Sequence, residues 1–205
     1  MVRRMQIIAS ARIALVAGLS VLVGCASHGP QRSSSASCGE TDGVVDLENR
    51  PTNPFHLSNG NPPALVFTFV RTDCPISNRY APEIERLYEK YNPRGVGFWL
   101  VYPETDTSSQ EIARHAQDYR LSVPVLRDTA QSLVRKSGVR VTPEAAVFSD
   151  KGKELYHGRI DDRMVDFGKE RAAPTQHDLD EALDSILKHK PVRKAVQPAI
   201  GCYLH

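Results

Sequence analysis

The chain has 205 residues, of which 24% are charged and 40% hydrophobic, and its 26 lysines and arginines nearly balance 24 acidic residues. The net charge of +2 is too small for a nucleic-acid-binding surface, and residues of both signs are interspersed along the chain. We therefore expect no nucleic-acid partner. Beyond the N-terminal region, enough chain remains for a single domain with a proper hydrophobic core.

The N-terminal region has the features of an export signal. Arg3, Arg4 and Arg12 precede an apolar segment, residues 13–23. This segment is about half as long as the roughly 20 residues that a helix needs to cross a bilayer, so it predicts a signal peptide instead of a membrane span.

The apolar segment ends in Leu22-Val23-Gly24-Cys25, which resembles a bacterial lipobox. The resemblance implies that residues 1–24 are a lipoprotein signal peptide and that Cys25 is lipidated, which anchors the protein to a bacterial membrane facing the periplasm. The resemblance also implies the outer membrane, because Ala26 follows the cysteine. An ordinary cleaved signal peptide is the alternative. Residues 25–43, rich in Ser and Gly, predict a flexible tether.

Strand and helix patterns alternate along residues 44–190, which we expect to form the folded domain. Apolar runs predict strands at residues 64–70, 96–102 and 123–126, and a hairpin formed by residues 145–148 and 154–160. Apolar residues at helical spacing, with capping signals, predict helices from Cys74 to Asn92 and over residues 108–119, 129–136 and 179–187. The order predicts an α/β sandwich with a mixed central sheet flanked by helices, followed by a C-terminal tail, residues 191–205.

Cys74 lies where the first predicted strand gives way to a helix. The thiolate is the reactive form of cysteine, and the N-terminus of a helix stabilises it through free N–H groups and the helix dipole. Arg71 and Arg79 also favour the thiolate, whereas Asp73 opposes it. The pattern indicates that Cys74 is a redox nucleophile.

Two further motifs accompany this cysteine. Pro82 follows Cys74 by eight residues, and Val141-Thr142-Pro143-Glu144 precedes the predicted hairpin. Together they resemble the thioredoxin fold, in the redoxin branch that includes alkyl hydroperoxide reductases and thiol-specific antioxidant proteins. The resemblance implies a three-layer sandwich, a cis Thr142–Pro143 bond beside the cysteine, and docking of the substrate backbone on Thr142 and Pro143. The terminal Gly201-Cys202 also resembles a little-characterised group of exported bacterial redoxins.

The sequence departs from the better-known members of this branch at two positions. Thioredoxins have a second cysteine three residues after the first, where this chain has Ser77. Peroxiredoxins have a threonine three residues before the reactive cysteine, where this chain has Arg71. Ser77 could donate a hydrogen bond to the Cys74 thiolate or be a plain surface serine. Glu144 could tune the thiol or contact substrate, or it could accept hydrogen bonds from the backbone.

A single redox cysteine needs a second thiol to resolve the mixed disulfide or sulfenic acid that it forms. Cys202, on the tail, is our candidate for this resolving thiol, with Cys38 in the tether as the alternative. Cys202 could instead pair with another molecule.

We predict an extracytoplasmic thiol-disulfide oxidoreductase that acts on a protein or small-molecule thiol or disulfide and needs no cofactor. One alternative is a thiol peroxidase that reduces peroxide. The other is a non-catalytic binding or copper-delivery module, in which Cys74, Cys202 and His205 would have to converge. Our leading prediction includes no metal.

Overall fold

The computed structural model describes residues 42–57, 60 and 62–204. The predicted signal peptide, Cys25, Cys38, most of the tether and His205 lie outside these residues. Within the described part of the chain, no helix is both long and apolar enough to cross a membrane.

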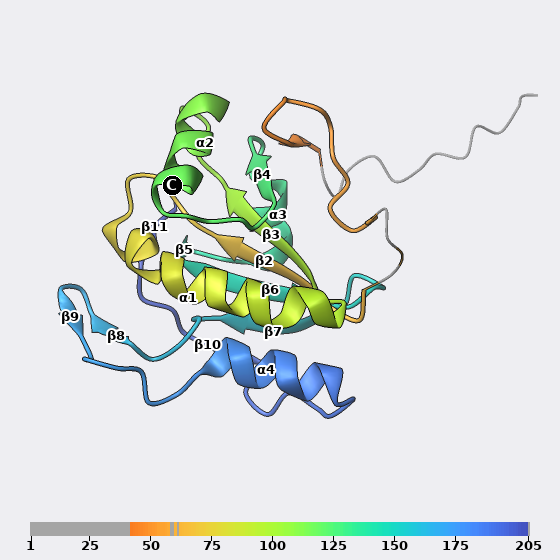
Figure 1. Ribbon diagram of the computed structural model, residues 1–205, viewed down its shortest axis with the longest axis vertical. Helices are drawn as coiled ribbons and strands as arrows, with labels where there is room; N and C mark the ends of the chain where they lie inside the picture. The colour runs from red at the N-terminus through yellow and green to blue at the C-terminus, as the bar shows by residue number, and fades with distance from the viewer. Residues whose placement is uncertain (1–41, 58–59, 61, 205) are drawn as a thin grey trace, which may run out of the picture. The chain divides into compact units, whose positions relative to one another are not determined.

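A mixed sheet of seven strands forms the centre of the fold, in the order β1-β4-β3-β2-β6-β7-β10 (Figure 1). Its strands are β1 (Val44–Val45), β2 (Leu65–Phe69), β3 (Gly97–Tyr102), β4 (Val125–Asp128), β6 (Glu144–Phe148), β7 (Glu154–Gly158) and β10 (Val196–Gln197). Strands β2, β3 and β4 run parallel, and β6 pairs antiparallel with both β2 and β7. All five residues of β2 are buried, as its continuous apolar sequence predicts.

Helices cover both faces of this sheet. They are α1 (Pro75–Tyr91), α2 (Ser109–Asp118), α3 (Ser132–Ser137) and α4 (Asp178–Leu187), with a short 3₁₀ helix at Asn92–Arg94. One hydrophobic cluster packs α1, α2 and α4 against one face of the sheet, and a second packs α3 against the other. Side chains of β2 alternate between the clusters, with Val66 in the first and Phe67 in the second. The predicted three-layer α/β sandwich is confirmed.

Local signals set most helix ends. Ser108 caps α2, and its hydroxyl and the Glu111 side chain form the predicted capping box. Gly138 ends α3 with φ 66°, a left-handed conformation that favours glycine. Helix α3 begins later than predicted because residues 129–131 form a turn, in which the N–H of Gln131 donates to the Asp128 carbonyl oxygen and Gln131 has φ 53°. The Asp128 carboxylate accepts hydrogen bonds from the amides of Ser132 and Val134 in the first turn of the helix.

Two small sheets flank the main sheet. Strands β8 (Met164–Asp166) and β9 (Lys169–Glu170) form a hairpin within a segment that the sequence analysis left without regular structure. Strand β11 (Cys202–Tyr203) pairs antiparallel with β5 (Val141–Thr142). The described part of the C-terminal tail therefore contributes β10 to the edge of the main sheet and then returns to the loop that contains Pro143.

Candidate functional site

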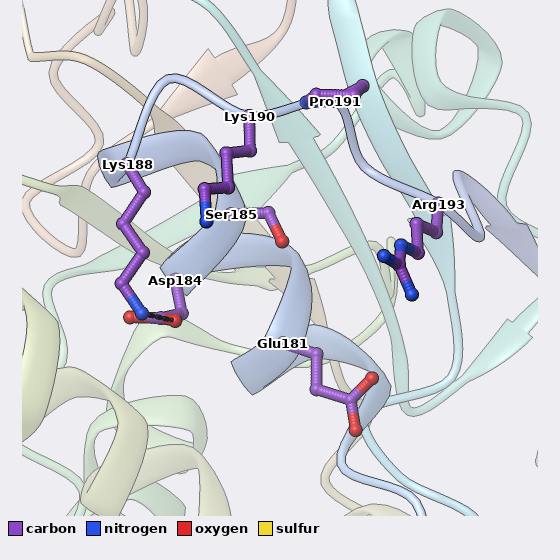
Figure 2. Close-up of a pocket in the computed structure, with 7 residues that line it drawn as sticks. All are labelled: Glu181, Asp184, Ser185, Lys188, Lys190, Pro191 and Arg193. Carbon is purple, nitrogen blue, oxygen red and sulfur yellow. Dashed lines mark hydrogen bonds and ion pairs between the residues drawn. The ribbon is translucent and has the colours of Figure 1, made fainter.

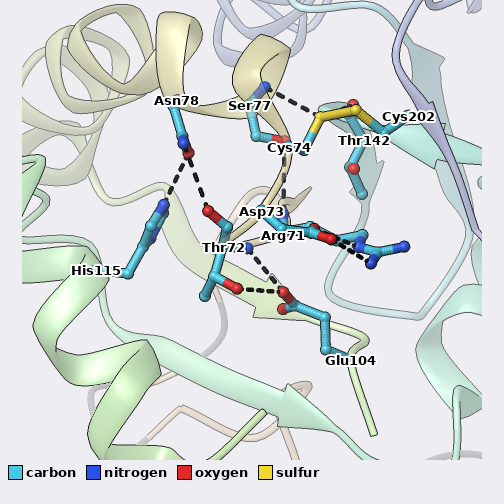
Figure 3. Close-up of a disulfide and its surroundings, with 10 residues drawn as sticks. All are labelled: Arg71, Thr72, Asp73, Cys74, Ser77, Asn78, Glu104, His115, Thr142 and Cys202. Carbon is cyan, nitrogen blue, oxygen red and sulfur yellow. Dashed lines mark hydrogen bonds and ion pairs between the residues drawn. A yellow bond between two sulfur atoms is a disulfide. The ribbon is translucent and has the colours of Figure 1, made fainter. Parts of the chain in front are cut away.

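A disulfide joins Cys74 to Cys202, which lie 128 residues apart in the sequence, with 6.0 Å between their Cα atoms (Figure 3). Cys74 lies at the N-cap of α1, and Cys202 is the first residue of β11. The side chain of Cys74 is 0% exposed, whereas Cys202 is partly exposed. In this oxidised form the more accessible of the two cysteines is therefore Cys202, although Cys74 is the predicted redox nucleophile.

The sulfur of Cys74 lies between a hydrogen-bond donor and an acceptor. The backbone N–H of Ser77, in the first turn of α1, donates to Cys74 Sγ at 3.4 Å. The carbonyl oxygen of Thr142 lies 3.1 Å from the same sulfur. A disulfide sulfur has no hydrogen to donate, so the contact with Thr142 is a hydrogen bond only when Cys74 is a thiol. The Ser77 N–H and the helix dipole stabilise a thiolate, and the carbonyl stabilises the protonated thiol.

Ser77 donates a hydrogen bond to Cys74 Sγ, which is one of the two roles weighed from the sequence, but the donor is its backbone N–H and not its hydroxyl. Its side chain is 2% exposed, so it is not a surface serine. Its hydroxyl accepts a long hydrogen bond, 3.5 Å, from the backbone N–H of Arg71, and the residue contacts the sulfur through its own backbone. Any residue except proline would supply the same N–H.

The Thr142–Pro143 bond is cis, as the resemblance implied, and it lies beside the disulfide. Thr142 is fully buried and faces Cys202 in the antiparallel β5–β11 pair. Next along the tail, the backbone N–H of Leu204 donates to the carbonyl oxygen of Arg140 at 3.0 Å. The edge where we expected a substrate backbone to dock is therefore occupied by the chain's own C-terminal tail in this form.

Glu144 supports the backbone of this loop. Its Oε2 accepts hydrogen bonds from the N–H groups of Arg140 and Val141, at 2.9 and 3.3 Å, and its Oε1 lies 3.0 Å from His157 Nε2. The neighbouring Glu144 carboxylate raises the pKa of His157. Of the alternatives left open for Glu144, the structure favours hydrogen bonding to the backbone.

Both arginines near the sulfur have acidic partners. Arg79 forms an ion pair with Glu170 on β9, and Arg71 forms a two-pronged pair with Asp73, with distances of 2.9 and 2.8 Å. Because an acidic partner compensates each of these charges, the backbone N–H of Ser77 and the α1 dipole remain as the sources of thiolate stabilisation.

Buried polar groups that the sequence analysis did not identify hold the loop before Cys74. Glu104 accepts hydrogen bonds from the N–H and the hydroxyl of Thr72, both at 2.7 Å, and burial raises the pKa of Glu104. Asn78 donates to the Thr72 carbonyl oxygen at 3.4 Å, and its own carbonyl oxygen lies 2.8 Å from His115 Nε2 (Figure 3). Burial lowers the pKa of His115. No local sequence signal indicates the contacts of Glu104 with Thr72 and of His115 with Asn78, which join residues 32 and 37 positions apart.

Cys202 lines a groove of about 330 Å³ between the start of α1 and the β8–β9 hairpin. Its other lining residues are mostly apolar: Pro75, Ile76, Arg79, Met164, Phe167, Gly168 and Glu170. A second hollow, of about 400 Å³, lies beside the C-terminal half of α4 and has a charged lining that includes Asp184, Lys188 and Arg193 (Figure 2). It contains no sulfur, so the groove at Cys202 is the hollow relevant to redox chemistry.

The copper arrangement is not assembled among the described residues. Both sulfurs are in the disulfide, so neither is a free thiolate ligand. A different group of possible ligands, Glu83, Asp161 and His177, has atoms within 4.8 Å of one another. Glu83 already accepts two hydrogen bonds from Arg86, whose positive charge disfavours a cation there. We assign no metal to this group.

Comparison with known proteins places the chain among redoxins. The thiol-disulfide oxidoreductase ResA of Halalkalibacterium halodurans is 23% identical over 159 residues, which cover 76% of this chain and 89% of that protein. A solved structure of an uncharacterized conserved protein from Geobacillus kaustophilus, 23% identical, has a TM-score of 0.67 over 78% of this chain and 86% of its own. A thioredoxin-like protein from Aeropyrum pernix, 16% identical, has a TM-score of 0.51 over 73% of this chain and 89% of its own.

These two structural likenesses concern the fold, and they agree with the thioredoxin-like arrangement described above. The family match is independent of them and extends over residues 41–169, which is more than half of the chain. The matched segment includes Cys74 and the Thr142–Pro143 turn and ends before the tail that carries Cys202. The protein belongs to the Redoxin family.

Proposed function

We propose that this protein is a thiol-disulfide oxidoreductase whose redox couple is formed by Cys74 and Cys202. The proposal rests on the disulfide, which joins Cys74 at the N-terminus of α1 to Cys202. Cys202 is paired with Thr142, the residue before the cis-proline. The relative from Halalkalibacterium halodurans, named as a thiol-disulfide oxidoreductase, supports the same activity.

The reduced protein transfers two electrons to a disulfide in two exchange steps. The Cys74 thiolate attacks one sulfur of the substrate disulfide, a Cys74–substrate bond forms, and the other substrate sulfur leaves as a thiolate. The Cys202 thiolate then attacks Cys74 Sγ, which releases the second substrate thiolate and forms the Cys74–Cys202 disulfide. The same steps in reverse oxidise a dithiol. Substrates of this class are protein or small-molecule thiols and disulfides.

Thr142 and Pro143 dock the substrate backbone in this scheme, after β11 leaves the edge of β5. In the oxidised form the disulfide holds β11 on Thr142. Reduction removes this covalent tether and leaves only the short β-pairing, which a substrate strand can replace. Ser77 supports the Cys74 thiolate through its N–H, Glu144 holds the β5 backbone, and Arg79 borders the approach to Cys202.

We also propose that the protein works outside the cytoplasm. The basic and apolar N-terminal segment and the lipobox-like sequence ending at Cys25 support export and lipid anchoring. A disulfide between Cys74 and Cys202 is compatible with an oxidising compartment such as the periplasm.

The proposal is tested by mixing the reduced protein with a disulfide-linked peptide and following release of the peptide thiols. We expect the wild-type protein to release both thiols, Cys74→Ser to release none, and Cys202→Ser to stop as a mixed disulfide on Cys74. Cys38→Ser, which tests the alternative resolving cysteine, should match the wild type. If Cys74→Ser retains exchange, the proposal is wrong. If the wild type reacts with peroxide but not with peptide disulfides, the peroxidase alternative replaces it.

A further inference from the structure

The two sulfurs of the disulfide differ in how an outside molecule can reach them. Cys74 is 0% exposed, and the helix start, Thr142 and the disulfide partner surround it. Cys202 is partly exposed and lines the groove between α1 and the β8–β9 hairpin. Thiol-disulfide exchange requires the incoming sulfur to approach the sulfur that it attacks, so access selects between the two cysteines.

We propose that a reducing thiol enters the oxidised protein through this groove and attacks Cys202, so that Cys74 departs as the thiolate. The groove favours polypeptide cysteines that are flanked by apolar side chains. The inference rests on the proposed function, because it concerns how the oxidised form of the same disulfide is reduced. It assigns Cys202 as the entry point for electrons, although Cys74 is the nucleophile toward substrate disulfides.

Two electrons pass from the reductant to the protein in two exchange steps. The incoming thiolate supplies an electron pair to a new bond with Cys202 Sγ, the Cys202–Cys74 bond breaks, and its pair remains on Cys74. A second incoming thiolate attacks the first incoming sulfur, which forms a disulfide between the two reductant cysteines and releases Cys202 as a thiolate. The protein gains two electrons and the reductant loses two.

The surroundings of Cys74 suit the departing sulfur. Exchange is faster when the leaving thiol has the lower pKa. The Ser77 N–H lies 3.4 Å from Cys74 Sγ, and Cys74 caps a 17-residue helix. The Thr142 carbonyl opposes the charge, but Cys202 lies on a two-residue strand without a helix terminus to stabilise a thiolate.

The groove itself selects the class of thiol. Pro75 and Ile76 line it from α1, and Met164 and Phe167 line it from the β8–β9 hairpin. Its two charged residues, Arg79 and Glu170, form an ion pair with each other and so leave no free charge to attract an acidic thiol.

Exposed apolar side chains continue this lining toward the C-terminal tail. Phe167 is 56% exposed and Tyr203 is 63% exposed, with their ring centroids 6.4 Å apart, and Val165 is 48% exposed. Because Cys202 lines the same groove, an occupant that reacts with it must carry a thiol, and apolar neighbours of that thiol would cover these side chains.

The test uses two single-cysteine peptides that are identical except for the residues beside the cysteine, which are leucines in one and glutamates in the other. The oxidised wild-type protein is mixed with each peptide, quenched after short intervals with an alkylating agent, digested without reductant and mapped by mass spectrometry. We expect the peptide on Cys202 and the alkyl group on Cys74. We expect the leucine peptide to react about tenfold faster than the glutamate peptide, because partial burial of one leucine side chain in the groove would stabilise the bound peptide by a corresponding free energy.

Two variants test whether the lining of the groove causes the preference for the leucine peptide. Phe167→Ser should remove much of the advantage of the leucine peptide, because Phe167 lines the groove and is too exposed to be needed for folding. Val196→Ser, at an apolar residue that is 67% exposed and lies outside the groove lining, should leave the advantage unchanged.

The outcomes separate this inference from the proposed function. Peptide on Cys74 with alkyl on Cys202 would overturn the entry at Cys202 while leaving disulfide exchange intact. Equal rates for the two peptides would overturn the apolar selection. If neither peptide joins either cysteine, the proposed function itself is wrong.

Discussion

Thr142 faces Cys202 across the β5–β11 pair, and its carbonyl oxygen lies 3.1 Å from the sulfur of Cys74. One residue of the cis-proline loop therefore contacts both cysteines of the disulfide, one through strand pairing and the other directly. The pairing with Thr142 therefore places Cys202 beside Cys74 at the start of α1.

Reduction of the disulfide should destabilise the fold. The bond closes a loop of 128 residues, and crosslinks of this kind typically contribute about 2–4 kcal/mol by restricting the unfolded chain. We expect the free energy of unfolding in urea to fall by about that amount when dithiothreitol is added. The Cys74→Ser/Cys202→Ser double variant should show no response to reductant. Equal wild-type stability with and without reductant would contradict the prediction.

Gly201→Ala should loosen the tail. A Cβ at this position would overlap the carbonyl oxygen of Thr142, which is backbone and cannot turn aside. Overpacking of this kind costs about 1–3 kcal/mol. We expect faster hydrogen exchange at the Leu204 amide and slower closure of the disulfide after oxidation.

The control for this glycine is Gly152→Ala, where an added Cβ meets no other part of the molecule within 4 Å. Because Gly152 has φ 73°, alanine strains the turn between β6 and β7 there, away from the tail. It should leave the exchange of the Leu204 amide unchanged. Unaltered exchange in Gly201→Ala itself would show that the close approach to Thr142 does not hold the tail.

Ser77→Ala should leave the reactivity of Cys74 nearly unchanged. The residue contacts the sulfur through its backbone N–H, which alanine also supplies. In a Cys202→Ser background, titration of the thiolate absorbance should give a Cys74 pKa that differs from the parent by well under one unit, or less than about 1.4 kcal/mol. A rise of a full unit would mean that the hydroxyl stabilises the thiolate in the reduced protein.

The pair of His157 and Glu144 should make stability depend on pH. Because Glu144 raises the pKa of His157 above its usual 6.5, the folded protein binds the proton more tightly than the unfolded chain does. The stabilisation is therefore complete below pH 6.5 and is lost as the pH rises through the folded-state pKa. The measurement is the difference in unfolding free energy between the wild type and His157→Gln across this range.

That difference should shrink as the pH rises. His56→Gln removes an exposed histidine and should show no such trend. A difference that grows with pH would reverse the sign that the Glu144 contact requires.

The sequence was sufficient to predict the elements that form the core. The apolar run at β2, the helical spacing in α1 and the capping box at Ser108 are local patterns, and each lies where it was predicted. The strands β5, β8, β9 and β11 contain two or three residues each, too few to show a period of two. Their pairing depends on tertiary contacts, so the β8–β9 hairpin and the edge that β11 occupies were missed.

In the site, too, local features could be predicted from the sequence and tertiary contacts could not. Cys74 was recognisable because a cysteine between a strand and a helix is a local feature. The contacts of Thr72 with Glu104 and of Asn78 with His115 join distant parts of the chain, and a single sequence carries no information on which polar side chains will meet. The partners of Arg71 and Arg79 were missed for this reason as well, and those ion pairs reduce the influence of both arginines on the thiol.

The most direct test of the account is a redox titration of the purified protein in buffers of defined thiol to disulfide ratio, with the state of each cysteine mapped by mass spectrometry. We predict one reversible two-electron transition in which Cys74 and Cys202 pass together from free thiols to a single disulfide. If Cys74 stays reduced, oxidises alone, or pairs with any other cysteine while Cys202 remains free, the redox couple proposed for this protein is wrong.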